Sequence, residues 1–216
     1  MTSISRDLLR GRSCLLMQVL LLGFLAASAA GAQDSTSVLS DRTVEVRITT
    51  PQAIINGTGG WFEAGRVLTA SHFFLSVRPE DIQEIVVIWK GNEFKARIEK
   101  VEDPEIVDAA MLIVEDSGAW KGARAQLCRS PLKPAQPVAT AFSPAMGAVM
   151  VIGTYGSPDA VDPLNPELGS TALTAFLPQG ASGANVYDRT SLCLVGLLSK
   201  QSKKSANGVE VYVTDI

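Results

Sequence analysis

The chain has 216 residues, of which 46% are hydrophobic and 19% are charged, and its formal net charge is −3. This apolar fraction is that of an ordinary globular protein and excludes a disordered or low-complexity chain. A charge so close to neutral gives no reason to expect a nucleic-acid partner. With one histidine and three cysteines, the chain has too few ligands for a site built from His and Cys, so we expect no metal.

Residues 1–32 have the three-part layout of a secretory signal peptide. Three arginines precede the apolar run Cys14–Leu25, and the small residues Ala30-Gly31-Ala32 supply a cleavage site before Gln33. The alternative is an N-terminal membrane anchor, but the apolar run is shorter than the roughly 20 residues that a spanning helix needs. We therefore expect cleavage, a secreted or periplasmic protein, and no membrane span afterwards.

Signal-peptide removal would leave two cysteines, Cys128 and Cys193. In an oxidising compartment these two can form a disulfide, which typically stabilises a protein by about 2–4 kcal/mol. The alternative is two separate buried thiols, since free cysteines are common in protein cores. The sequence leaves both possibilities open.

Short strand-like runs recur through residues 33–216, and turn signals such as Asn56-Gly57 separate them. The run Thr43–Thr49 alternates apolar and polar residues, as a half-buried strand does. Runs of helix length with a 3.6-residue apolar period are absent from this part of the sequence. We therefore predict an all-β barrel or sandwich, with a Pro-rich connector at 130–137 between two strand-rich halves. The other expected strands are Trp61–Phe62, Arg66–Thr69, Glu84–Lys90, Glu93–Val101, Ala109–Glu115, Val138–Phe142, Ala148–Thr154, Thr171–Phe176, Cys193–Ser199 and Val209–Thr214.

Three short motifs in this part of the sequence contain side chains that can take part in catalysis. The motif Val67–His72 (VLTASH) ends in the only histidine of the chain. The motif Val107–Val114 (VDAAMLIV) places Asp108 at the start of an apolar strand. The motif Gln179–Val186 (QGASGANV) holds Ser182 among small residues, and the strand sequence Leu194–Leu197 (LVGL) comes after it.

The order and spacing of these motifs resemble those of the trypsin-like (chymotrypsin-fold) serine proteases, over residues 43–215. In that family a histidine closes a V-L-T-A-A-H-like strand, an aspartate opens an apolar strand, and the serine lies in G-D/N-S-G-G-P. The resemblance implies two six-stranded antiparallel β-barrels with the triad at their junction. Residues 33–130 would form the first barrel and residues 131–216 the second.

The chemistry of such a site explains why these residue types are needed together. A serine hydroxyl is a weak nucleophile unless a base accepts its proton, and a neutral imidazole suits that task. A carboxylate bonded to the other ring nitrogen sets the tautomer of the imidazole. The resemblance assigns His72 as general base, Asp108 as the residue that orients it, and Ser182 as nucleophile. The backbone N–H groups of Gly180 and Ser182 would form the oxyanion hole.

The implied function is that of a serine endopeptidase, which cleaves polypeptide substrates through an acyl-enzyme without metal or organic cofactor. Three departures from the family pattern bear on this implication. Ala181 stands where the zymogen-activated branch has an acidic residue, and no Ile-Val-Gly-Gly-like start occurs near Thr43. A buried ammonium–aspartate pair therefore cannot shape the oxyanion loop, so other contacts must do so. Ser71 replaces an alanine next to the histidine, a change that we expect to be tolerated.

Simpler interpretations of the same residues remain. Alone, His72 can be a core or helix-capping residue, Asp108 a turn cap, and Ser182 a turn residue among small neighbours. The alternative function is a catalytically inactive trypsin-like pseudoprotease that acts as a protein-binding module, with the loop around Ala184 collapsed. An unrelated all-β domain with chance motifs would instead place His72, Asp108 and Ser182 far apart.

Overall fold

The computed structural model describes most of the chain after the expected signal peptide, which itself lies outside the described residues. Described are residues 35–103, 107–115, 118, 120–122, 124–130, 133, 135–142, 149–155, 171–174, 180–202 and 210–215. The chain divides into two compact units, Met1–Ser35 and Thr36–Ile216, and every described strand belongs to the second unit. Within the described ranges, no helix has the length and apolar character that crossing a bilayer requires.

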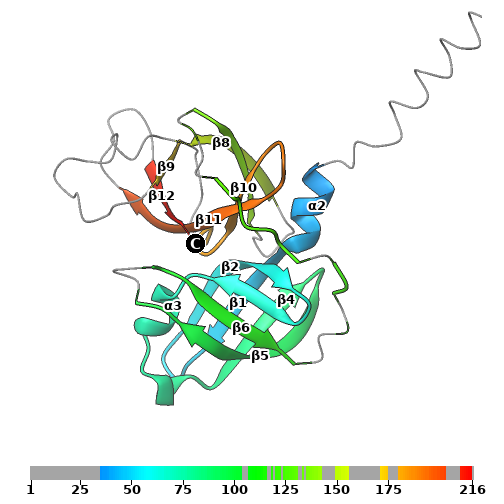
Figure 1. Ribbon diagram of the computed structural model, residues 1–216. Helices are drawn as coiled ribbons and strands as arrows, with labels where there is room; N and C mark the ends of the chain where they lie inside the picture. Colours follow the sequence, from blue (N-terminus) through cyan, green and yellow to red (C-terminus); the bar gives the residue numbers. More distant parts are fainter. Residues whose placement is uncertain are drawn as a thin grey trace, which may run out of the picture. The chain divides into compact units, whose positions relative to one another are not determined.

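Six antiparallel strands near the start of the described chain close into a first barrel (Figure 1). The neighbouring strands follow the order β1-β2-β3-β6-β5-β4, and β4 closes the barrel on β1. These strands are β1 (Thr43–Thr49), β2 (Ile54–Glu63), β3 (Arg66–Thr69), β4 (Glu84–Trp89), β5 (Asn92–Val101) and β6 (Ala110–Val114).

The remaining six strands close into a second antiparallel barrel in the order β10-β11-β12-β9-β8-β7. These are β7 (Pro137–Phe142), β8 (Val149–Tyr155), β9 (Thr171–Thr174), β10 (Asn185–Asp188), β11 (Leu194–Ser202) and β12 (Glu210–Asp215). The predicted all-β architecture of two six-stranded antiparallel barrels is therefore confirmed.

Inward-facing apolar side chains fill the first barrel around three tryptophans. Trp61 is fully buried, and its ring stacks on Trp120 with 5.5 Å between centroids and 6° between ring planes. Trp89 meets the same ring edge-on at 6.4 Å. The alternation in β1 agrees with this core, because Val44, Val46 and Ile48 are buried.

One local expectation from the sequence was wrong, and one strand was missed. Asn56-Gly57, expected to be a turn, lies inside β2, where Gly57 pairs with Val46 of β1. Glycine leaves room there for the Phe73 ring, which an added Cβ would meet at 2.2 Å, so the ring packs directly on the backbone. Strand β10 was not predicted, because its first two residues belong to the serine motif and its four residues show no alternation of their own.

The short helix α2 (Ser35–Arg42), also not predicted, is attached to the body of the protein by a few specific contacts. Leu39 is buried in an apolar cluster to which both barrels contribute residues. The carboxylate of Asp41 pairs with Lys90 at 2.7 Å, and its backbone carbonyl accepts a hydrogen bond from the indole of Trp89. The other buried members of the cluster are Leu68, Ala109, Ala125, Ala139, Ala141, Tyr187, Leu194 and Leu197.

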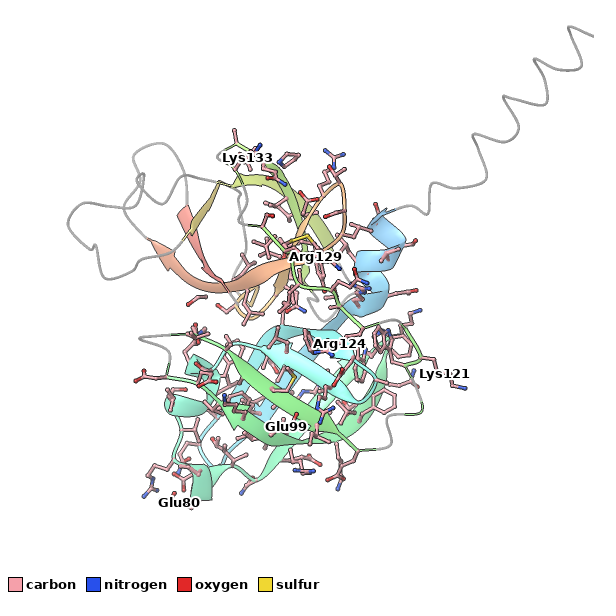
Figure 2. All side chains as sticks on the ribbon, in the orientation of Figure 1. Glu80, Glu99, Lys121, Arg124, Arg129 and Lys133 are labelled. Atoms are coloured by element: carbon pink, nitrogen blue, oxygen red, sulfur yellow. A yellow bond between two sulfur atoms is a disulfide. The ribbon has the colours of Figure 1, made fainter. Side chains whose placement is uncertain are left out.

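A disulfide joins Cys128 to Cys193 across 65 residues, so the structure selects the bonded alternative. Cys128 lies in the segment between the barrels, next to Arg129, which is labelled in Figure 2, and Cys193 precedes β11. The backbone N–H of Cys128 also donates to the carbonyl of Leu194 at 2.9 Å. The inter-barrel segment is thus attached covalently to the second barrel.

We predict that Trp61→Ala lowers the free energy of unfolding by about 3–5 kcal/mol, since it empties the centre of the first core. Ile54→Ala is the control, because Ile54 in the same strand is 62% exposed and should change stability by less than about 0.5 kcal/mol. Urea unfolding of both variants measures the difference. Equal losses would show that Trp61 does not organise this core.

Candidate active site

Strand pairing in the first barrel brings the histidine and aspartate motifs together. Thr69, the last residue of β3, pairs with Ala110, the first residue of β6. His72 begins the short helix α3 (His72–Leu75) just after β3, and Asp108 lies two residues before β6. The two side chains therefore leave neighbouring strands at the same edge of the sheet.

Asp108 lies at the centre of four hydrogen-bonding contacts. Its Oδ1 accepts hydrogen bonds from the Ser71 hydroxyl and from the backbone N–H of His72, both at 2.9 Å. Its Oδ2 lies 2.7 Å from His72 Nδ1 and accepts a hydrogen bond from the Ser199 hydroxyl at 2.5 Å. The Asp108 side chain is 1% exposed, whereas the His72 side chain is 32% exposed. The imidazole is therefore held from its buried side and open on the other.

These contacts determine the charge of Asp108. Burial by itself raises the pKa of the carboxyl group, but the hydrogen bonds from His72 and Ser199 and the attraction of the imidazolium outweigh it. The net result is a pKa well below the usual range of an aspartate. An ionised carboxylate can only accept hydrogen bonds. His72 must therefore carry its proton on Nδ1, which leaves Nε2 of the neutral ring free to accept one.

The loop that contains Ser182 packs against strand β2 of the first barrel. The backbone N–H of Thr58 donates to the carbonyl of Ser182 at 2.9 Å, and the Thr58 hydroxyl donates to the carbonyl of Gly180 at 2.8 Å. Gly183 has a φ of +81°, and an added Cβ would lie 2.2 Å from the carbonyl oxygen of Thr58. A side chain at position 183 would thus both strain the backbone and separate the loop from β2.

Of the three expected catalytic residues, the structure brings His72 and Asp108 into contact, while Ser182 lies in a neighbouring loop. His72 and Asp108 are in contact, and Ser182 lies in a loop that touches the strand preceding the histidine motif. Among the hydrogen bonds of the described residues, none joins Ser182 to His72. Within the same part of the chain, the N–H groups of Gly180 and Ser182 donate no hydrogen bond.

Sequence reasoning missed two hydroxyl groups at this site. Ser199 lies on β11, and its contact with Asp108 joins residues 91 positions apart, which no local pattern reveals. Ser71 was interpreted as a neutral replacement for alanine, yet its hydroxyl is fully buried and donates to Asp108. Its position directly before the only histidine was the available signal.

No group of three or more His, Cys, Asp or Glu side chains that could hold a metal ion occurs among the described residues. The polar side chains that surround Asp108 are instead hydroxyl donors and the imidazole. This set matches the needs of a buried carboxylate, which is stabilised by donors at each of its lone pairs.

Comparison with solved structures identifies the fold. The active form of the Rv3671c protease from M. tuberculosis aligns with a TM-score of 0.62 and 19% identity, over 84% of this chain and 79% of that one. Its inactive form gives 0.63 and 20%, over 83% and 86%. A serine endoprotease from Yersinia pestis gives 0.63 and 16%, over 83% and 61%. No family model and no curated protein sequence matches the chain. The chain therefore has the fold of the trypsin-like serine proteases.

We predict that the protein loses stability in acid partly through Asp108. Its pKa is lower in the folded chain than the ordinary value of about 3.9 in the unfolded chain. The stabilisation is therefore fully present above about pH 5 and is lost as the pH falls through the folded pKa. Urea unfolding from pH 7 to pH 3 should show a smaller acid-induced loss for Asp108→Asn than for the wild type. An equal acid-induced loss of unfolding free energy in both proteins would show that the low pKa of Asp108 does not contribute to it.

Proposed function

We propose that this chain is a serine endopeptidase that hydrolyses peptide bonds through an acyl-enzyme formed on Ser182, with His72 as general base and Asp108 orienting it. The observation that carries the proposal is the 2.7 Å contact between Asp108 and Nδ1 of the only histidine. It leaves Nε2 of the partly exposed imidazole available to accept a proton. The fold of the trypsin-like serine proteases supports the same chemistry.

In the proposed reaction, His72 Nε2 accepts the proton of Ser182 Oγ while that oxygen attacks the scissile carbonyl carbon. The N–H groups of Gly180 and Ser182 stabilise the negative oxygen of the tetrahedral intermediate. The imidazolium then gives its proton to the leaving amine, and the acyl-enzyme remains on Ser182. A water molecule then attacks the acyl carbon while His72 accepts its proton. The bond from the acyl carbon to Ser182 Oγ breaks, the imidazolium returns the proton to Oγ, and the acid is released. No step needs a metal or organic cofactor.

The proposed setting is extracellular or periplasmic, with a polypeptide as substrate. The signal-like residues 1–32 and the disulfide between Cys128 and Cys193 both support this setting, because disulfides persist in oxidising compartments. Structural neighbours described as proteases support a polypeptide substrate.

The second candidate function is an inactive pseudoprotease that binds proteins. It is favoured by one observation, namely that no hydrogen bond joins Ser182 to His72 among the described residues. Catalytic hydrogen bonds are often long without substrate and shorten when it binds, so this observation does not by itself oppose catalysis. Ala184 stands where the G-D/N-S-G-G-P motif has its second glycine after the serine, and its methyl group is fully buried in the core of the second barrel.

We predict that residues 33–216 react covalently with a fluorophosphonate probe and hydrolyse a fluorogenic peptide library. Ser182→Ala should abolish both activities without changing the thermal unfolding midpoint by more than a few degrees, because the change removes one oxygen from a partly exposed loop residue. Mass spectrometry of the labelled protein locates the adduct.

Ser76→Ala is the matched control, because Ser76 is an exposed serine at the end of α3, four residues after His72, and its hydroxyl donates to the carbonyl of Phe73. It should be labelled like the wild type. A folded wild-type protein that neither reacts with the probe nor cleaves any peptide would contradict the endopeptidase proposal and favour the binding module.

A further inference from the structure

The loop that would form the oxyanion hole needs a support other than an ion pair. Ala181 precedes Ser182 and has no charge to offer a buried ammonium group. The donors of an oxyanion hole must nevertheless be held in place before the reaction, since preorganisation is the source of their effect. Some other group must therefore hold the peptide units around Ser182.

Thr58 contacts the loop on both sides of Ala181. Its hydroxyl donates to the carbonyl of Gly180 at 2.8 Å, and its backbone N–H donates to the carbonyl of Ser182 at 2.9 Å. Thr58 is fully buried, and its own carbonyl accepts a hydrogen bond from the Thr69 hydroxyl at 2.7 Å. The residue is thus itself fixed between β2 and β3.

These bonds constrain three successive peptide units, because each unit is planar and its C=O and N–H point in opposite directions. The Thr58 hydroxyl holds the unit from Gly180 to Ala181. The N–H of Ala184 donates to the carbonyl of Ala181 at 3.0 Å and holds the unit that carries the Ser182 N–H. The Thr58 N–H holds the following unit, whose Gly183 N–H donates to the carbonyl of Leu198 at 2.7 Å.

Only one of these bonds depends on the identity of a side chain. The three backbone bonds form with any residue that fits, whereas the bond to Gly180 needs a hydroxyl at position 58. Gly180 has a φ of +92°, in the region that glycine enters freely and other residues avoid. Its conformational freedom makes this peptide the part of the loop that most needs an anchor.

We propose that the Thr58 hydroxyl is the positioning group of the oxyanion loop, which prevents the peptide unit after Gly180 from turning over. Thr58 contacts neither substrate nor reacting atoms, so it acts through Gly180 and Ser182. In this protein a neutral hydrogen bond from the first barrel takes the place of a buried ion pair. The inference rests on the proposed endopeptidase function, and it makes the Thr58 hydroxyl one of the groups that determine kcat.

The test compares Thr58→Val, which keeps the shape of the side chain without the hydroxyl, with Thr58→Ser, which keeps the hydroxyl. Thr58→Ala is a second variant without the hydroxyl, for use if valine does not fold. For a cleaved peptide, Thr58→Val should lower kcat by about 10-fold or more, approaching the effect of losing an oxyanion-hole donor. KM should change by less than about 2-fold, because ground-state binding is untouched. Thr58→Ser should stay within about 3-fold of the wild-type kcat.

Thr43→Val is the matched control. The Thr43 hydroxyl is also buried and donates to a backbone carbonyl, that of Leu39, at 2.8 Å, but Thr43 lies at the start of β1 and belongs to no part of the proposed site. This variant should lower the thermal unfolding midpoint while kcat stays at the wild-type value. All rates are measured at a temperature at which each variant is folded.

The outcomes separate the two proposals. A wild-type protein inert toward both peptide and fluorophosphonate overturns the endopeptidase function itself. An active wild type overturns the Thr58 inference alone if Thr58→Val keeps the wild-type kcat, if Thr58→Ser is as slow as Thr58→Val, or if Thr43→Val loses as much kcat as Thr58→Val. A kcat loss confined to the variants without the hydroxyl supports it.

Discussion

The candidate site depends on the buried carboxylate of Asp108. A buried charge is costly unless each of its lone pairs is bonded, and here Ser71, His72 and Ser199 supply four contacts. Two of these residues follow β3 in the first barrel, and Ser199 lies on β11 in the second. The same bonds that keep the carboxylate ionised therefore also join the barrels and orient the imidazole.

Small residues and hydroxyl groups let the Ser182 loop of the second barrel pack against the first barrel. Gly183 permits the Ser182 loop to lie directly against the backbone of Thr58, where a Cβ would meet the carbonyl oxygen at 2.2 Å. Thr58 then bonds to the carbonyls of Gly180 and Ser182. The loop is held by neutral hydrogen bonds, which agrees with the absence of an acidic residue at position 181.

Local patterns in the sequence predicted short strands and an all-β barrel or sandwich, whereas the two six-stranded barrels were implied by the resemblance of the three motifs to the trypsin-like serine proteases. Alternation in Thr43–Thr49 and the apolar run before His72 need no knowledge of distant residues. Ser199 was missed because its partner lies 91 positions away. The Asn56-Gly57 pair was misread as a turn, because the ring of Phe73 that packs on this glycine reaches it only in the folded barrel.

Which ring nitrogen of His72 carries the proton is the most direct test of whether Asp108 orients the imidazole. The chain contains a single histidine. Nitrogen NMR of protein labelled with ¹⁵N only in histidine therefore reports on His72 without assignment. In the neutral ring, we predict a proton on Nδ1 that is bonded to Asp108, with Nε2 unprotonated. A neutral ring protonated on Nε2 would show that Asp108 does not orient this imidazole, and would contradict the central claim.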